Sequence, residues 1–189
     1  NMDTPLSRDS YDAACFAVGA AIDASENKGF ALVRPPGHHA FADHGSGFCI
    51  FNNMAIAALK ASKEKRVFIL DIDVHHGNGT EELVLDEPNI QFLSIHQGGI
   101  YPGSGMSDRG NCLNVPMPAG AGDKEYIKVL EDKVMPALSK FDPDLVGVSV
   151  GFDTYYLDQG FVSGNSLSLT DKSYEKVREL LKPYEVFYT

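Results

Sequence analysis

The sequence is poor in cysteine and has no long apolar stretch. Its three cysteines, Cys15, Cys49 and Cys112, are scattered and form no Cys-x-x-Cys pair. This spacing argues against a disulfide framework or a cysteine zinc site, so we expect three reduced, buried thiols. The apolar runs are only a few residues long, too short to span a membrane. The polar opening NMDTPLSRDS does not resemble a signal peptide, and we therefore expect a cytoplasmic protein.

Positive charge is also scarce. The 189 residues hold 16 lysines and arginines against 26 aspartates and glutamates, which gives a net charge of −10. This acidic balance argues against direct nucleic-acid binding, because such binding depends on basic side chains that neutralise phosphates. It is compatible with attraction of a cationic substrate.

Strand and helix patterns alternate along the chain. Short apolar runs predict strands at 30–33, 67–70, 90–95, 145–150 and 185–188. Helical spacing and capping residues predict helices at 9–26, 52–62, 79–85, 123–139 and 170–181. The glycine-rich stretch 97–111 is typical of a binding loop, and 113–122 of a connection with turns. The alternation predicts an α/β fold in which helices flank a mostly parallel sheet. No repeat or linker interrupts it, so we expect one domain over residues 1–189.

The segment 67–80, VFILDIDVHHGNGT, is the most informative part of the chain. It begins as a buried strand and then presents Asp71, Asp73 and His75 at alternate positions. Side chains two residues apart on an extended chain point the same way, so these three can share one face. Oxygen and nitrogen donors in such a set suit zinc, manganese or iron.

Two further polar clusters follow predicted strands. His38 and His39 come directly after Arg34-Pro35-Pro36-Gly37, and Asp153 comes just after the strand 145–150. Any one of these residues alone is as readily a helix cap or a solvated side chain. Together, however, they should converge, because the carboxyl ends of parallel strands meet at one edge of a sheet. Asp73, His75 and Asp153 would then bind a metal, and the two histidines would transfer protons, as in a metal hydrolase.

The sequence resembles the histone deacetylase family, which includes bacterial deacetylase-like amidohydrolases and acetylpolyamine amidohydrolases. The matching motifs are RPPGHHA (34–40), GSGFCIFNN (45–53), LDIDVHHGNGT (70–80), SIHQ (94–97), YPGSG (101–105), NVPMPAGAGD (114–123) and GFD (151–153). The asparagine of HHGNGT is similar to the class II and bacterial branch. The resemblance implies an arginase/deacetylase fold and zinc-dependent hydrolysis of the acetamide of acetyl-lysine or a related small acetylated amine.

The resemblance also implies roles for individual residues. The zinc ligands would be Asp73, His75 and Asp153. His39 would be the general base, paired with Asn78, and His38 the neighbouring electrostatic histidine, paired with Asp71. A structural potassium site is implied for the set formed by Asp71, the Ser94 hydroxyl and the carbonyls of Asp73, His75 and Ile95. The acyl-lysine tunnel is implied to have Phe48 and Tyr101 as walls, with Gly47 beside the substrate amide.

Parts of the family pattern are not found in this sequence. The catalytic tyrosine of the family lies in a Gly-Gly-Tyr motif, and we expect Tyr188 to be strand core instead. The first strand and amino-terminal rim loop of the family are also not matched. We therefore expect a partial domain with weak activity, and exposed core surface that favours a homo-oligomer.

Three other functions remain open from the sequence. An acetylpolyamine amidohydrolase would share the same chemistry behind a narrower entrance. A manganese ureohydrolase of the arginase type would share the fold, although the tandem histidines and the three-ligand set favour a one-metal site. A non-catalytic fragment could hold acetyl-lysine without cleaving it.

Overall fold

The computed structural model describes residues 3–158 and 166–189. Within them, all strand pairs are parallel, and one five-stranded sheet has the order β3-β2-β1-β4-β5. Its strands are β1 (Val67–Asp71), β2 (Ile90–Gln97), β3 (Cys112–Met117), β4 (Leu145–Ser149) and β5 (Val186–Tyr188). The predicted single α/β domain with a parallel sheet is confirmed.

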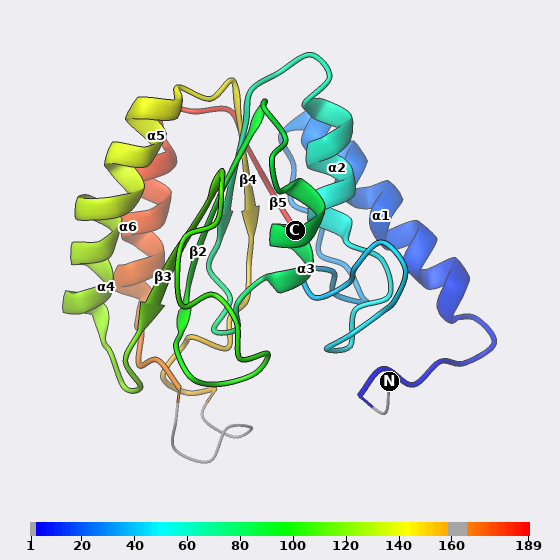
Figure 1. The fold of residues 1–189 in the computed structure, drawn as a ribbon, viewed down its shortest axis with the longest axis horizontal. Coiled ribbons are helices and arrows are strands. Elements are labelled where there is room, and N and C mark those ends of the chain that lie inside the picture. Colours follow the sequence, from blue (N-terminus) through cyan, green and yellow to red (C-terminus); the bar gives the residue numbers. More distant parts are fainter. Residues whose placement is uncertain (1–2, 159–165) are drawn as a thin grey trace.

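The helices form a layer on each face of the sheet (Figure 1). One layer contains α1 (Ser10–Asn27), α2 (Asn53–Ala61) and α3 (Asn78–Val84). The other contains α4 (Asp123–Val129), η1 (Leu130–Val134), α5 (Met135–Phe141) and α6 (Asp171–Leu181). The alternating side chains of β1 explain both layers: Val67 and Ile69 pack with α1 and α2, whereas Phe68 and Leu70 pack with the opposite helices.

The predicted helix 123–139 is continuous but not uniform. It runs from Asp123 to Phe141, and its middle turn, η1, is π-helical. Pro136 follows this turn at the start of α5. A proline lacks the N–H of the helical ladder, and its ring collides with the carbonyl four residues earlier, here that of Asp132. The wider turn around Asp132 accommodates this proline.

Two strand predictions differ from the structure. The run 30–33 forms only one parallel bridge, between Phe30 and Tyr188, and Leu32 is 86% exposed. The run meets β5 at Tyr188, the last residue of that short strand, so the pairing does not extend into a ladder. Conversely, β3 was predicted as a connection because Pro116 lies within it. Since β3 is the edge strand of this sheet, a missing N–H on one side is tolerated there.

The cysteine prediction is correct for two residues and wrong for one. All three thiols are free, and Cys49 and Cys112 are buried, but Cys15 is exposed on α1. The apolar face of α1 is formed by smaller side chains: Ala14, Ala17, Ala21 and Ala24. Within the described residues, no helix is both long and apolar enough to cross a membrane.

The order of the strands determines where a ligand can approach. From β1 the chain moves outward through β2 to β3, then returns to the other side of β1 to form β4 and β5. The switch point therefore lies between β1 and β4, and in open α/β sheets ligands bind beyond the carboxyl ends of the strands at such a point. The two segments that leave β1 and β4 there contain Asp73, His75 and Asp153.

Candidate active site

Three potential metal ligands meet at the switch point. Ligand atoms of Asp73, His75 and Asp153 all lie within 4.8 Å of one another. His75 Nδ1 is 3.0 Å from Asp73 Oδ1 and 3.2 Å from Asp153 Oδ2. Ligands about 2.1 Å from a tetrahedral zinc ion lie roughly 3.4 Å apart, so this set closely fits a zinc ion.

The backbone around the triad fixes its carboxylates. Asp153 Oδ1 accepts a hydrogen bond from the Val74 N–H at 3.0 Å, which ties the segment after β4 to the segment after β1. A Cβ atom on Gly151 would lie 2.1 Å from Asp73 Oδ2. Only glycine at that position leaves room for the Asp73 carboxylate.

Charge within the triad is strongly coupled. Burial opposes a charge on His75, but hydrogen bonds to Asp153 and Asp73 outweigh it and raise the pKa of His75 to about 10. Burial and the adjacent Asp73 charge raise the pKa of Asp153. The two carboxylates of the triad thus strongly favour a nearby positive charge. When no metal is bound, the protonated ring of His75 supplies it.

His38 pairs with the buried carboxylate of Asp71. His38 Nδ1 is 3.0 Å from Asp71 Oδ2, and both side chains are buried. Burial alone would lower the pKa of His38, but the charges of Asp73 and Asp71 outweigh it and raise that pKa to about 9. A Cβ on Gly77 would lie 2.3 Å from Asp71 Oδ2, so this glycine makes room for the pair.

His39 has the opposite electrostatic environment. Its Nδ1 is 2.7 Å from Asn78 Oδ1. An amide oxygen only accepts hydrogen bonds, so Nδ1 carries the proton and the neutral ring keeps an unprotonated Nε2. Burial and the nearby positive charge of His38 lower the pKa of His39 to about 3. The tandem histidines, whose ring centroids are 4.0 Å apart, are therefore one charged and one neutral.

Two of the three predicted substrate-binding residues, Gly47 and Tyr101, border this pair. Gly47, with φ +53, passes so close to the His39 ring that a Cβ would lie 2.4 Å from its Cδ2. The Tyr101 ring meets the His39 ring edge-on, with centroids 5.0 Å apart, and its hydroxyl is 2.6 Å from Ser46 Oγ. Phe48 has a left-handed backbone, φ +66, and is 67% exposed. Tyr101 thus lies against the histidines, whereas Phe48 is turned to the outside.

Two of the predicted potassium ligands, Asp71 and Ser94, lie on neighbouring strands. Asp71 and Ser94 are register partners in β1 and β2, and neither is exposed to solvent. His96 Nε2 lies 3.0 Å from the Gly105 carbonyl and must donate to it, so Nδ1 accepts the Ser94 hydroxyl proton at 2.9 Å. Because Ser94 Oγ donates in this bond, its lone pairs can still bind a cation. Together with the Asp71 carboxylate they are hard oxygen donors, which alkali cations prefer.

Several polar residues of the site could not be assigned a role from the sequence. Ser46, which holds Tyr101, was only part of a glycine-bearing loop. His76 was visible as the second half of a tandem pair, and His96 as a histidine at a strand end, but neither was assigned a partner. Glu81 gave no signal, because an acidic residue in the first turn of a helix normally faces solvent. Here it is buried.

The fold and the site together define an α/β domain of the arginase/deacetylase type with a candidate metal centre at its switch point. The family model described as "Histone deacetylase domain" matches residues 1–186. This chain belongs to the histone deacetylase family.

Similar proteins include one from a plant and one from an archaeon. Histone deacetylase 14, chloroplastic, of Arabidopsis thaliana is 47% identical over 75% of this chain and 37% of its own length. A probable deacetylase of Archaeoglobus fulgidus is 36% identical over 94% of this chain and 53% of its own.

Two solved structures have the same fold. The HDA15 HD domain matches all of this chain and 59% of its own, with a TM-score of 0.91 and 36% identity. An acetylpolyamine aminohydrolase from Burkholderia pseudomallei matches 98% of this chain and 58% of its own, with a TM-score of 0.89 and 29% identity. This chain spans about a third to three fifths of the lengths of these four proteins.

Proposed function

We propose that this domain hydrolyses the acetamide of acetyl-lysine or a related acetylated amine in a zinc-dependent reaction. One observation carries the proposal. A neutral histidine with an unprotonated Nε2, His39, lies beside a compact set of two carboxylates and one imidazole. A metal hydrolase needs this combination of three ligands and a separate base.

Asp73, His75 and Asp153 would hold the zinc ion. When bound there, zinc supplies a Lewis acid that polarises the acetyl carbonyl and lowers the pKa of a water molecule. Two carboxylate ligands neutralise the charge of the ion, so a base in the protein is needed to take the proton from that water.

His39 would be this base. Asn78 holds the Nδ1 proton and so directs the reactive lone pair to Nε2. After it has accepted a proton at Nε2, His39 can donate it to the nitrogen of the leaving amine. His38 stays charged through Asp71 and Asp73 and would stabilise negative charge that develops next to it.

The Tyr101 ring supports a substrate with an aliphatic stem. The ring lies next to His39, and an aromatic face there can cover methylene groups of a lysine or polyamine chain. Gly47 would face the substrate amide, and Phe48 would contact the stem nearer the entrance. The similarity to an acetylpolyamine aminohydrolase makes acetylated polyamines the second substrate class.

Asp71 and Ser94 would also bind a structural potassium ion between β1 and β2. The two residues are fully buried register partners, and Ser94 begins a chain of hydrogen bonds through His96 to Gly105. Such an ion would balance part of the negative charge of the site.

The proposal is tested by turnover of two substrates, an acetyl-lysine peptide and an acetylated polyamine, with the chain loaded with one equivalent of zinc. We expect His39→Ala to abolish turnover. His44→Ala is the matched control, because His44 lies in the same loop region but is exposed, and its ring pairs with Asp43 and stacks on Phe41. The ratio of the two rates identifies the preferred substrate class.

Two results would contradict parts of the proposal. One zinc ion bound without turnover of either substrate would favour acetylated-amine binding without hydrolysis. Two manganese ions bound per chain would favour the ureohydrolase class.

A further inference from the structure

The loop between β2 and β3, residues 98–111, is fixed to the domain by buried side chains. His76 Nδ1 is 2.8 Å from the Ser104 hydroxyl. His96 Nε2 donates to the Gly105 carbonyl at 3.0 Å. Asn114 Nδ2 donates to the Ser107 carbonyl at 3.0 Å. Three residues of the loop, Ser104, Gly105 and Ser107, are thus attached to side chains that are themselves almost fully buried.

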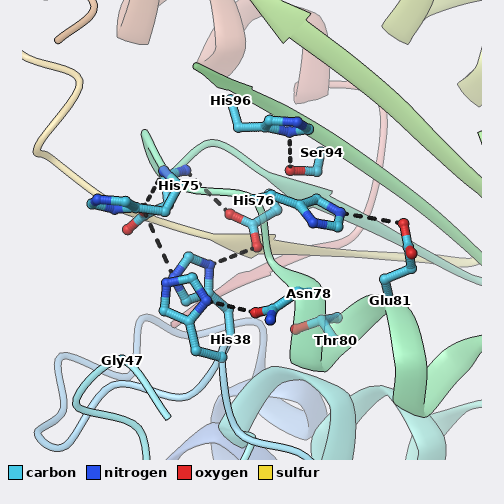
Figure 2. Close-up of polar contacts among 12 residues, drawn as sticks. His38, Gly47, His75, His76, Asn78, Thr80, Glu81, Ser94 and His96 are labelled. Carbon is cyan, nitrogen blue, oxygen red and sulfur yellow. Dashed lines mark hydrogen bonds and ion pairs between the residues drawn. The ribbon is translucent and has the colours of Figure 1, made fainter. Parts of the chain in front are cut away.

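Glu81 connects two of these attachments. Its Oε2 accepts hydrogen bonds from His76 Nε2 at 3.2 Å and from Asn114 Nδ2 at 2.6 Å. Burial opposes its charge, but the hydrogen bonds from His76 and Asn114 outweigh it and lower the pKa of Glu81. Figure 2 shows His76 between Glu81 and the strand ends, with its ring pointing to the carboxylate.

The Glu81 carboxylate determines which ring nitrogen of His76 carries the proton. A carboxylate only accepts hydrogen bonds, so His76 carries its proton on Nε2. In the neutral ring, Nδ1 is then an acceptor, and the Ser104 hydroxyl donates to it. Glu81 therefore orients the nitrogen that holds the loop.

The loop lies so close to these rings that its conformation depends on them. Gly105 has φ +77, and a Cβ there would be 2.6 Å from His76 Cγ and 2.6 Å from His96 Nε2. Arg109, at the far end of the loop, reaches Glu82 at 2.8 Å and Glu81 at 3.5 Å. The loop is therefore held on helix α3 as well as on the strand ends.

The same loop carries the aromatic wall of the candidate active site. Tyr101 lies three residues before Ser104. Its ring is 5.0 Å from the His39 ring, and its hydroxyl is held by Ser46. The ring is thus fixed by Ser46 at its tip and, through the backbone, by Ser104 behind it.

We propose that Glu81 acts through His76 and Ser104 as a positioning residue that holds Tyr101 against the site and so determines affinity for the stem of the substrate. The inference rests on the proposed function. It assigns to Glu81 no contact with the substrate and no part in metal binding.

The test uses the zinc-loaded chain and two hydroxamate probes. Acetohydroxamic acid is so small that it contacts the metal without reaching the Tyr101 ring. A hydroxamate with a six-carbon stem and a terminal phenyl ring must also contact the wall. Losing one hydrogen bond costs about 1 kcal/mol, so we expect Ser104→Ala to raise the Kd of the long probe roughly fivefold and to leave that of acetohydroxamic acid unchanged. Ser104→Thr, which keeps a hydroxyl, should restore the Kd of the long probe.

Ser107→Ala is the matched control. It makes the same chemical change three residues further on, where the loop uses the backbone carbonyl and not the hydroxyl. Both Kd values should equal those of the wild type. An equal loss of both probes in Ser104→Ala, or no loss of either, would overturn the inference.

Glu81 itself is tested by Glu81→Leu, which removes both acceptor oxygens at similar size, alone and combined with Ser104→Ala. We expect the same selective loss of the long probe, and no further loss in the double variant, because both residues act through one chain of hydrogen bonds. Additive losses, or a Glu81→Leu variant that binds the long probe as the wild type does, would remove Glu81 from the chain. A wild type that binds zinc but neither probe would overturn the proposed function itself.

Discussion

The tandem histidines show how strongly neighbouring groups determine the pKa of a side chain. His38 and His39 are adjacent and both are largely buried, yet the pKa of one is about 9 and that of the other about 3. His38 lies among carboxylates, whereas His39 faces the neutral amide of Asn78 and the positive charge of His38. One ring is therefore charged and the other available as a base.

This contrast predicts the effect of Asn78→Asp. A carboxylate in place of the amide would favour the imidazolium form and raise the pKa of His39. The acid limb of the pH dependence of kcat/KM should then move to higher pH, with lower activity at neutral pH. An NMR titration of the His39 ring measures the same shift independently of turnover. An unchanged pKa in the variant would mean that Asn78 does not control His39.

Metal binding should release a proton from His75. In the metal-free chain the pKa of His75 is about 10, so the ring is protonated at neutral pH, whereas a metal ligand must be deprotonated. We expect the zinc affinity to rise about tenfold for each pH unit between pH 7 and 9, with about one proton released per ion. Calorimetry in buffers of different ionisation enthalpy counts the protons. A pH-independent affinity would be inconsistent with His75 as a ligand.

That Asp73, His75 and Asp153 come together could be predicted from sequence, whereas the residues that support this candidate metal site could not. Asp73, His75 and Asp153 stand at strand ends, and the geometry of a parallel sheet is enough to bring them together. Glu81 is buried because Asn114 and Arg109, each about 30 residues further along the chain, cover it. Nothing local distinguishes it from a solvent-facing helical glutamate.

At the scale of elements, the turn after β4 is the tightest part of the site. Gly151→Ala would place a methyl group 2.1 Å from Asp73 Oδ2, which forces the carboxylate or the turn to move. We expect zinc affinity to fall by at least roughly tenfold, the size of effect seen when the orientation of a ligand is lost. Competition with a chromogenic chelator measures it.

Helix α1 provides the matched glycine. Gly19 is exposed in the middle of the helix, and a Cβ there would meet none of the described residues within 4 Å. Because glycine weakens a helix interior, Gly19→Ala should raise the free energy of unfolding by about 0.5–1 kcal/mol and leave zinc affinity unchanged. Urea denaturation tests this. Destabilisation would show that α1 contacts something along this face.

Helices and strands could be predicted where the apolar pattern of the segment itself determines its structure. The prediction failed where the structure of a segment depends on its neighbours in the sheet. The strands β1, β2 and β4 were recognised because they are buried on both faces. The strand β3 was missed because Pro116 is tolerated only at a sheet edge, and edge position is a property of the whole sheet. The run 30–33 has strand composition, but only Tyr188 pairs with it.

At the scale of the whole molecule, the candidate metal centre joins the two halves of the sheet. Asp73 and His75 follow β1, and Asp153 follows β4, on either side of the switch point. A metal ion there would cross-link the two segments. Stability and metal occupancy should therefore change together.

The metal-free chain should lose stability both at alkaline pH and at acid pH. The folded-state pKa values of His38 and His75, about 9 and 10, exceed the value near 6.5 of an unfolded histidine. Their stabilising contribution is complete below about pH 6.5 and is lost as the pH rises through 9 to 10. The pKa values of His39 and His96, about 3 and 4, are lowered, so these residues cost stability as the pH falls below about 6.5.

A maximum of stability near pH 6.5 follows, and zinc should change only one side of it. Bound zinc replaces the His75 proton, so the alkaline loss should become smaller while the acid loss remains. Urea midpoints between pH 5 and pH 10, with and without one equivalent of zinc, measure both limbs. His38→Gln should reduce the alkaline loss in the metal-free chain, because the variant has no proton to lose there. An alkaline limb unaffected by both zinc and this substitution would mean that neither His38 nor His75 holds its proton in the folded chain.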